Sequence, residues 1–256
     1  EVGPKGIPDK LSGFLFLAHN KNKSLPELVM QLAQKIIVAD DHPLFRTALQ
    51  QAVSQIAPEA EIVQAESLPE LQTVVENHTD TDLILLDLNM PGAHGYSGLV
   101  FLRSHYPEIP VMVVSACEEP AIMCQAIDHE ASGYIAKSSS LEEISAAIGD
   151  VLKGDIYLPK KARQHQHAPD TVSMDLAQKL ASLTPQQFRV LTMMSEGMLN
   201  KQIAYDLEVS EATIKAHVTA IFRKLGVRTR TQAVIAVQTL DIERNDLASD
   251  PVGEAE

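Results

Sequence analysis

The stretch Leu83-Ile84-Leu85-Leu86-Asp87-Leu88-Asn89-Met90-Pro91-Gly92 decides the fold, because a continuously apolar run ends there in a carboxylate. Four successive apolar residues without alternation are typical of a strand that is buried on both faces, as in a parallel sheet. In doubly wound parallel sheets, ligands bind beyond the carboxyl ends of the strands. We therefore expect Asp87 to lie at the functional edge of such a sheet.

Similar runs alternate with helical patterns from residue 35 to residue 153. The β-rich runs lie at 35–39, 61–65, 83–86, 111–114 and 133–136, and the helical segments lie near 43–57, 68–77, 96–105, 120–129 and 140–153. Ser140 and Glu143 have the spacing of a capping box at the start of the last helix. Five βα units predict an α/β doubly wound domain with a five-stranded parallel sheet and helices on both faces.

The pattern changes after residue 153. Gly, Pro and polar residues interrupt residues 154–182, which we interpret as a linker, and we expect His165 and His167 to be solvated there rather than to bind a metal. Residues 183–240 have an all-helical pattern. Their expected helices begin at the capping box of Thr184 and Gln187, at Asn200, at Ser210 and at about Thr231, and end near Gly197, Leu207, Gly226 and Leu240. This pattern predicts a small all-α helix-turn-helix domain.

The net charge is −13, which argues against indiscriminate nucleic-acid binding, but the charge is unevenly distributed. Residues 35–182 have 9 Lys and Arg against 21 Asp and Glu, whereas residues 183–240 have 7 against 4. A small basic module therefore follows an acidic domain. Residues 241–256 have 1 basic and 6 acidic residues, and we expect them to form a disordered tail.

The N-terminal residues 1–34 are interpreted as an extension. Their apolar run, 11–18, is shorter than the ~20 residues that span a bilayer and is not followed by a signal-peptidase site. We expect the native chain to begin at Met30, with the preceding residues as upstream translation or an expression remnant. Cys117 and Cys124 lack metal-ligand spacing and fit a reducing compartment, so we expect a cytoplasmic protein without membrane contact.

Polar residues follow four of the predicted strands. Asp40 and Asp41 follow the first strand, Asp87 the third, Ser115 the fourth and Lys137 the fifth. Three carboxylates at one edge would repel one another unless a hard cation such as Mg²⁺ lay among them. A carboxylate can also attack phosphorus, while a hydroxyl and a lysine hold the phosphoryl oxygens. The alternative is that each strand-end Asp only caps the helix that follows.

Four motifs in this domain resemble the response-regulator receiver family. They are Val38-Ala39-Asp40-Asp41-His42-Pro43, Leu86-Asp87-Leu88-Asn89-Met90-Pro91-Gly92, Val114-Ser115-Ala116 and Gly133-Tyr134-Ile135-Ala136-Lys137. The resemblance implies that Asp87 is the phosphoacceptor. It also implies that Asp40, Asp41 and Asp87 bind Mg²⁺ together with the backbone carbonyl of Asn89.

The resemblance also implies roles for three residues that respond to phosphate. Ser115 would be the switch hydroxyl, Lys137 the phosphate-contacting cation, and Tyr134 the aromatic residue that swings inward as Ser115 turns to the phosphate. A packing role for Tyr134 is the alternative. A phosphohydrolase of the haloacid-dehalogenase type would need an Asp two residues after the nucleophile, where this chain has Asn89. We therefore do not expect an enzyme, although a receiver catalyses its own phosphotransfer and dephosphorylation.

The third helix of the C-terminal domain has two faces. The apolar residues Ile214, Val218, Ile221, Phe222 and Leu225 form a stripe that we expect to pack inward. Lys215, Thr219 and Arg223 share another face, with Thr213 and Ala216 nearby. A helix with one buried face and such a second face suits a major groove, where it reaches bases and phosphates together. An ordinary solvated face is the alternative.

The same domain resembles the LuxR-type DNA-binding domain. The motifs are Leu183-Thr184-Pro185, Gly197, Asn200-Lys201-Gln202-Ile203-Ala204, Val209-Ser210-Glu211-Ala212-Thr213-Ile214-Lys215-Ala216-His217 and Lys224-Leu225-Gly226-Val227. The resemblance implies that Lys215 is the leading DNA contact, with Ala216 and Thr219 beside it. It also implies that the fourth helix forms a dimer contact through Val234, Ile235 and Val237, for which core packing is the alternative.

Together the two domains are similar to the NarL/FixJ class of response regulators, with two departures. Arg189 replaces a usual Glu, which puts a family ion pair in question, and Leu199 replaces a usual Ser, which alters a helix cap. The resemblance implies a transcriptional regulator that receives a phosphoryl group from a sensor histidine kinase and binds double-stranded promoter DNA as a homodimer. The alternatives are a DNA-binding regulator with a vestigial receiver, and an interaction module that binds no DNA.

Overall fold

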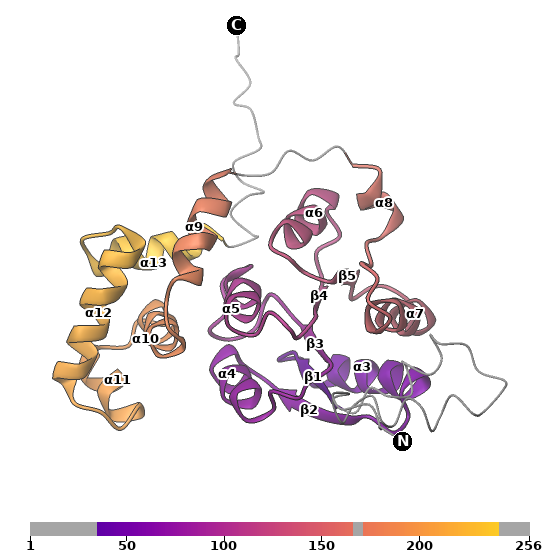
Figure 1. Ribbon diagram of the computed structural model, residues 1–256, viewed down its shortest axis with the longest axis horizontal. Coiled ribbons are helices and arrows are strands. Elements are labelled where there is room, and N and C mark those ends of the chain that lie inside the picture. Colours follow the sequence, from indigo (N-terminus) through magenta and orange to yellow (C-terminus); the bar gives the residue numbers. More distant parts are fainter. Residues whose placement is uncertain (1–34, 166–170, 241–256) are drawn as a thin grey trace, which may run out of the picture.

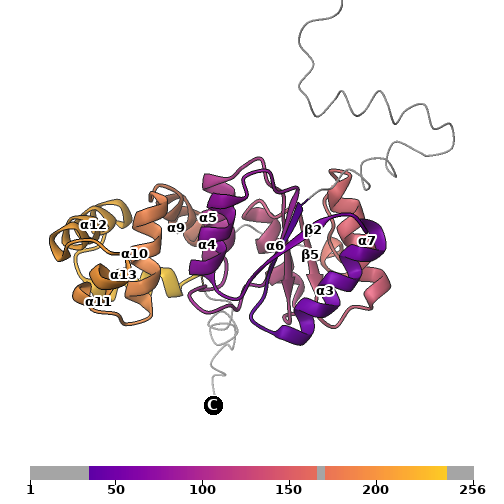
Figure 2. The same cartoon turned by 90° about the horizontal axis from the view of Figure 1, so that it is seen from below.

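The computed structural model describes residues 35–165 and 171–240, which form two lobes that lie side by side (Figures 1 and 2). The larger lobe is an α/β domain and the smaller is entirely helical. No helix among the described residues has the length and apolar character needed to cross a bilayer. The predictions for residues 1–34, His167 and residues 241–256 lie outside the described residues.

The α/β lobe is built on one five-stranded sheet. Its strands are β1 (Lys35–Ala39), β2 (Glu61–Ala65), β3 (Leu83–Leu86), β4 (Val111–Ser115) and β5 (Gly133–Ala136). The strand order is β2-β1-β3-β4-β5, and every neighbouring pair is parallel. The predicted α/β doubly wound fold is confirmed, and the order reverses between β1 and β3.

Helices cover both faces of the sheet (Figures 1 and 2). They are α3 (Pro43–Ile56), α4 (Leu68–Asn77), α5 (Ser97–His105), α6 (Pro120–Asp128) and α7 (Leu141–Leu152). Alternate strand residues point to opposite faces, so Ile36, Val38 and Leu85 join the cluster beneath α3 and α7, whereas Ile37, Ala39 and Leu86 join the cluster beneath α4, α5 and α6. Both faces are buried, which explains why the central strands are apolar throughout.

The segment interpreted as a linker contains two helices, α8 (Lys160–Arg163) and α9 (Thr171–Ala181). The interpretation of 154–182 as a linker did not anticipate α9, which packs against α5 and buries Leu180 at 1% exposure. The prolines that indicated a linker, Pro159 and Pro169, both precede α9. These prolines therefore do not interrupt α9, which begins after both of them.

The helical lobe contains α10 (Pro185–Ser195), α11 (Asn200–Asp206), α12 (Glu211–Leu225) and α13 (Arg230–Gln238). The predicted caps are present: Thr184 and Gln187 form a capping box, and Ser210 Oγ accepts the Thr213 N–H at 3.1 Å. Gly226 ends α12 with a φ of 73°, a left-handed conformation that glycine adopts without steric cost. The fourth helix starts and ends earlier than predicted, with Thr229 as its N-cap.

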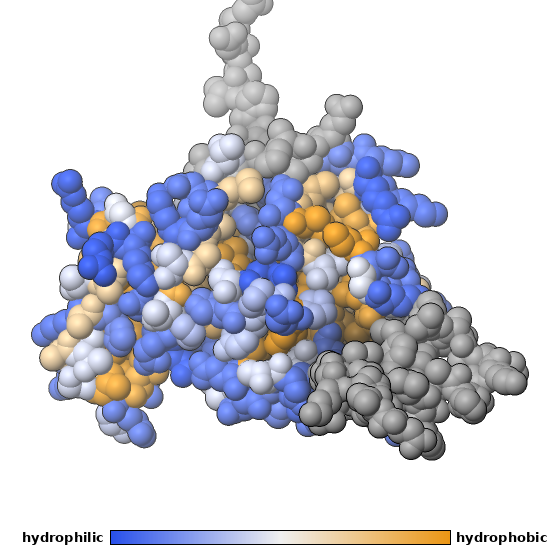
Figure 3. Space-filling view, viewed as in Figure 1, coloured by the Kyte–Doolittle hydropathy of each residue, from blue (hydrophilic) through white to orange (hydrophobic). Residues whose placement is uncertain are grey.

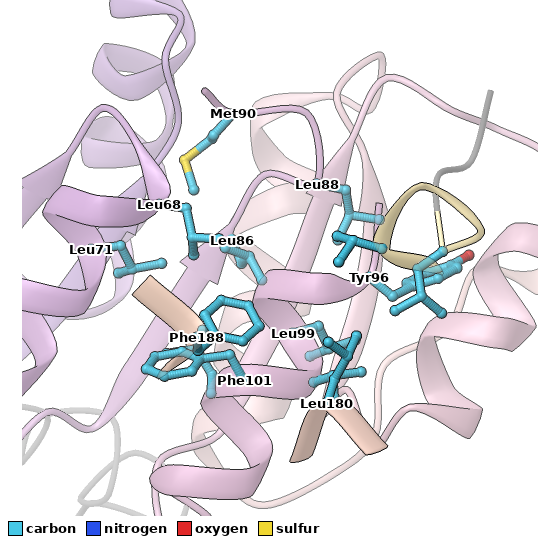
Figure 4. Packing of buried hydrophobic residues seen from close by; sticks show 14 of the residues in the cluster. Leu68, Leu71, Leu86, Leu88, Met90, Tyr96, Leu99, Phe101, Leu180 and Phe188 are labelled. Atoms are coloured by element: carbon cyan, nitrogen blue, oxygen red, sulfur yellow. The ribbon is translucent and has the colours of Figure 1, made fainter. Parts of the chain in front are cut away.

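The two lobes share one hydrophobic cluster. Phe101 of α5 stacks on Phe188 of α10 with ring centroids 4.7 Å apart, and Leu180 of α9 lies beside α5 (Figure 4). The polar contacts around this cluster also cross between the lobes. His94 Nε2 lies 2.8 Å from Ser195 Oγ, and His105 Nε2 lies 2.8 Å from the Leu183 carbonyl oxygen. The docked arrangement therefore buries apolar surface and pairs polar groups at its margin.

The turn after β3 also touches the helical lobe. Gly92 has a φ of +80°, and a Cβ at this position would lie 3.0 Å from Thr192 Cγ2 of α10 and 3.0 Å from Pro69 Cδ of α4. Such distances are shorter than carbon–carbon van der Waals contact. Glycine is therefore favoured here by the left-handed φ, and a Cβ would in addition crowd α4 and α10.

Replacement of Ile148 by Ala tests the packing beneath α3 and α7. Ile148 is fully buried, so Ile148→Ala should lower the free energy of unfolding of the α/β lobe by ~2–5 kcal/mol in urea titrations. Leu44→Ala is the control, because Leu44 is 89% exposed, and its effect should stay within about 0.5 kcal/mol. Equal effects of the two substitutions would contradict this packing.

Candidate functional site

The strand order brings the predicted acidic residues to one edge of the sheet. Asp40 and Asp87 directly follow the neighbouring strands β1 and β3, and both side chains are almost fully buried. Lys137 follows β5 and reaches across this edge. Its Nζ lies 2.6 Å from Asp40 Oδ2 and 2.9 Å from Asp87 Oδ2. The structure therefore brings the predicted carboxylates and the predicted cation together.

Burial and charge act in opposite directions on these groups. Burial raises the pKa of Asp87, and the hydrogen bond and positive charge of Lys137 oppose this shift. Burial also disfavours the charged form of Lys137, but its interactions with Asp40 and Asp87 outweigh this effect and raise the pKa of Lys137. The buried carboxylates are thus stabilised by a nearby cation.

The acidic residues form a cluster that could hold a metal ion. Ligand atoms of Asp40, Asp41, His42 and Asp87 all lie within 4.8 Å of one another. Asp41 Oδ1 is buried without a hydrogen bond of acceptable angle, although His42 Nδ1 lies 2.6 Å away. Carboxylate oxygens with unused lone pairs are the ligands that Mg²⁺ prefers, so the residues present fit this ion.

A pocket of about 390 Å³ opens onto Asp87. It is lined by His42, Leu44, Phe45, Asp87, Asn89, Ala116 and Lys137. Asn89 is exposed, and its backbone N–H donates to Asp87 Oδ1 at 3.2 Å. A reactant that enters this pocket can therefore reach the Asp87 carboxylate and the Lys137 ammonium.

Two further predicted residues lie on the neighbouring strands β4 and β5. Ser115 is the last residue of β4, and Tyr134 is the second residue of β5. Ser115 is fully buried, and its Oγ accepts the Cys117 N–H at 3.2 Å. Tyr134 is also fully buried and donates its hydroxyl to the Cys117 carbonyl oxygen at 2.8 Å, while burial raises the pKa of its phenol. Both side chains therefore bind the backbone of one residue, Cys117, and the Tyr134 ring lies inside the domain.

Sequence reasoning gave no role to three residues in the first turn of α3 and just before it. His42 contacts the carboxylates, the Phe45 ring lies 5.0 Å from Lys137 Nζ, and Arg46 Nη1 donates to the Asp40 carbonyl oxygen at 2.8 Å. The available signal was proximity, because α3 starts at Pro43, directly after the acidic pair. These residues support and orient the carboxylates from the helix side.

The predicted DNA-binding residues share one exposed surface. Thr213, Lys215, Ala216, Thr219 and Arg223 of α12 are all exposed, whereas Ile214, Ile221 and Leu225 are buried against the helical lobe. Helix α12 packs on α9, α10, α11 and α13. Figure 3 shows hydrophilic side chains, with apolar ones between them, along the outer edge of the lobe where α12 lies.

The predicted dimer residues differ in their exposure to solvent. Ile235 is 50% exposed and Val234 is half-buried, but Val237 is only 4% exposed and belongs to the hydrophobic core. In this conformation Val237 packs in the core of its own chain, which is the alternative given above, and its role as a dimer contact stays a prediction. Its position on the inner side of α13 follows from helical periodicity, since Ala233, one turn earlier, is fully buried as well.

The two departures from the LuxR-type pattern have visible consequences. Arg189 Nη2 donates to Thr73 Oγ1 at 2.5 Å and to the Pro69 carbonyl oxygen at 3.3 Å, both on α4 of the other lobe. Leu199 provides no side-chain cap to α11, but Gln202 Oε1 accepts the Leu199 N–H at 2.7 Å. The first departure thus contributes to docking between lobes, and the second removes one half of a helix cap.

Comparisons with protein families agree with this arrangement of two domains. Residues 36–149 match the family described as response regulator receiver domain, and residues 181–237 match bacterial regulatory proteins of the luxR family. The class is therefore that of DNA-binding response regulators, which are transcription regulators.

Curated relatives align with this chain over both domains. The chain is 42% identical over 217 residues to the glycerol metabolism activator of Pseudomonas putida, an alignment that covers 81% of this chain and 96% of that protein. It is 31% identical over 207 residues to the nitrate/nitrite response regulator protein NarL of Escherichia coli, covering 79% and 94%. A structure of RcsB from Salmonella typhimurium aligns at 24% identity with a TM-score of 0.44, covering 85% and 98%. The chain belongs to the NarL-type response regulators.

Replacement of Asp41 by Asn tests the metal cluster. Loss of one carboxylate charge should weaken Mg²⁺ binding at least about tenfold, because even residues that only orient metal ligands contribute that much. The affinity can be measured by isothermal titration calorimetry. Asp80→Asn is the control, since Asp80 pairs with Lys35, the first residue of β1, at the opposite end of that strand from Asp40. An unchanged affinity in the Asp41 variant would remove Asp41 from the site.

Proposed function

We propose that Asp87 accepts a phosphoryl group from the phosphohistidine of a sensor histidine kinase, and that this reaction controls promoter binding. The observation that carries the proposal is a buried carboxylate that faces an open pocket, with Lys137 Nζ at 2.9 Å. A carboxylate so placed can act as a nucleophile toward phosphorus, and the lysine can then bind the oxygens of the transferred group.

The reaction follows from these positions. A carboxylate oxygen of Asp87 attacks the phosphorus, the bond between phosphorus and the imidazole nitrogen breaks, and the imidazole leaves with the electron pair. Lys137 exchanges part of its interaction with Asp87 for the phosphoryl oxygens. Asp40 and Asp41, with the backbone carbonyl of Asn89, would hold Mg²⁺, which neutralises the charge on the transferred group. The same groups would let water remove the phosphoryl group later.

The phosphoryl group would then rearrange the loop after β4. It adds about two negative charges next to Ser115, whose hydroxyl can donate to a phosphoryl oxygen. Ser115 Oγ now accepts the Cys117 N–H, and Tyr134 donates to the Cys117 carbonyl oxygen. Rotation of Ser115 toward the phosphate would break the first of these hydrogen bonds. The rearrangement would thus reach the loop and α6, which follows it.

The output would be release of the helical lobe from α4 and α5. In the docked arrangement the Leu240 carbonyl oxygen accepts the Tyr96 N–H at 3.2 Å, which ties the chain just after α13 to the α/β lobe. Release would free α13 to form a homodimer contact through Ile235 and Val234. Two recognition helices would then lie about one DNA turn apart, ~34 Å. We place this activity in the bacterial cytoplasm, on double-stranded promoter DNA.

Within each copy, α12 would enter the major groove. Lys215 would make the leading DNA contact, with Thr213, Ala216, Thr219 and Arg223 on the same exposed surface. In the docked arrangement α12 packs through its buried face, and the face with the predicted contacts is exposed. Docking would therefore act on dimer formation and on the orientation of the lobe rather than by covering α12.

Replacement of Asp87 tests the control by phosphate. Asp87→Ala should abolish the gain in promoter affinity that beryllofluoride and Mg²⁺ produce in the unmodified protein, because the analogue binds only to the carboxylate. Asp150→Asn, which alters an exposed pair with Lys153 on α7, should leave the gain unchanged. Selective DNA binding that ignores the analogue in the unmodified protein would instead indicate a vestigial receiver.

Replacement of Thr73 by Val tests the docking. Thr73→Val removes one of the two acceptors of Arg189, leaving the Pro69 carbonyl oxygen and the helical lobe unchanged, and a hydrogen bond from a charged donor contributes ~1.5–3 kcal/mol. The unphosphorylated protein should therefore bind promoter DNA about tenfold more tightly. Thr47→Val is a matched control, because Thr47 donates to Pro43 on α3 just as Thr73 donates to Pro69 on α4. An unchanged affinity of the Thr73 variant would contradict inhibition by docking.

A further inference from the structure

Helix α12 begins with an ion pair on the stripe that carries the predicted DNA contacts. Glu211 is the first residue of α12, and its Oε1 lies 2.9 Å from Nζ of Lys215, one turn later. Thr219 and Arg223 continue the same i, i+4 spacing, and all four residues are exposed. A carboxylate and an ammonium group therefore stand side by side at the N-terminal end of this stripe.

Glu211 is the only acidic residue of α12, and a helix that approaches phosphates would be repelled by its charge. The position has a benefit that requires no DNA, since an acid in the first turn of a helix interacts favourably with the helix dipole. The hydrogen bond with Lys215 lowers the pKa of Glu211, so the side chain remains an ionised acceptor at neutral pH. The helix dipole accounts for an acid in the first turn, and the ion pair in addition places this carboxylate beside Lys215, the predicted leading DNA contact.

The edge of a G·C base pair is complementary to such a pair. In the major groove it presents the guanine O6 and N7 acceptors beside the cytosine N4 amino donor. Lysine is a common partner of O6 and N7, and a carboxylate accepts a hydrogen bond from N4. The N-terminal residues of a recognition helix are those that reach base edges, and Glu211 and Lys215 lie in the first two turns of α12.

We propose that Glu211 is a specificity-determining residue that, together with Lys215, recognises a G·C base pair in the operator. Glu211 accepts a hydrogen bond from cytosine N4, and Lys215 donates to guanine O6 or N7. A phosphate must compete with Glu211 for the Lys215 ammonium, whereas the G·C edge satisfies both groups at once. The pair thus weakens binding to unrelated DNA and favours one base pair. This inference rests on the proposed placement of α12 in the major groove.

The test is selection from randomised duplexes at fixed salt, with beryllofluoride and Mg²⁺, using the full chain and its Glu211→Gln variant. The unmodified protein should select a G·C pair at one position that depends on residue 211. Glu211→Gln retains the shape of the side chain but adds a donor, so discrimination at that one position should fall about tenfold while other positions are unchanged. Circular dichroism of each variant should show the helix content of the unmodified protein, and Glu211→Ala should show the same loss of discrimination.

The matched control is Asp175→Asn. Asp175 pairs with Lys179 at 2.5 Å with the same i, i+4 spacing, but on α9, so this variant should keep the selected sequence. If Glu211→Gln raises the affinity for every sequence by the same factor and the base preference is unchanged, Glu211 is only a counter-charge and the inference is overturned. If the unmodified protein selects no sequence at all, the proposed DNA-binding function fails first, and the two failures are thereby distinguished.

Discussion

The repulsion among carboxylates at one edge of a parallel sheet is the constraint on which the rest of this structure depends. Two of these carboxylates, Asp40 and Asp87, are almost wholly buried. Without a cation nearby, burial would favour their protonated form or destabilise the folded domain. Lys137 therefore has to cross the edge from β5, and Arg46 has to hold the Asp40 carbonyl from α3. Lys137 from β5 thus supplies positive charge to the carboxylates, and Arg46 from α3 holds the backbone that carries Asp40.

The features that could be predicted from the sequence are those with a local physical cause. Short β-rich runs between helical segments predicted all five strands, and β3 and β4 are apolar throughout because they are buried on both faces. The N-caps Thr184 and Ser210 and the terminal Gly226 predicted two helices of the smaller lobe, because each satisfies groups within its own turn. The site was predictable for a related reason: the ends of parallel strands meet at one edge, so Asp40 and Asp87 could be placed together from their positions in the chain.

The features that could not be predicted depend on contacts between distant segments. Helix α9 has only a short apolar face, and its packing against α5 stabilises it. The periodicity of α13 separates Val237, which is buried, from Ile235, which is half exposed, but which face of α13 packs inward is set by its contacts with α10 and α12. Arg189 was recognised as unusual, but its partners on α4 lie more than a hundred residues earlier, beyond the reach of any local pattern.

Gly92 has a mechanical consequence. The turn that carries it begins at Asp87, and at Gly92 that turn has no clearance from Thr192 of α10, not even for a methyl group. Because a Cβ at Gly92 would lie 3.0 Å from Thr192 Cγ2, a displacement of this turn toward the smaller lobe would press on the Thr192 side chain of α10. The turn that starts at the buried carboxylate therefore ends against a helix of the smaller lobe, although the two segments lie far apart along the chain.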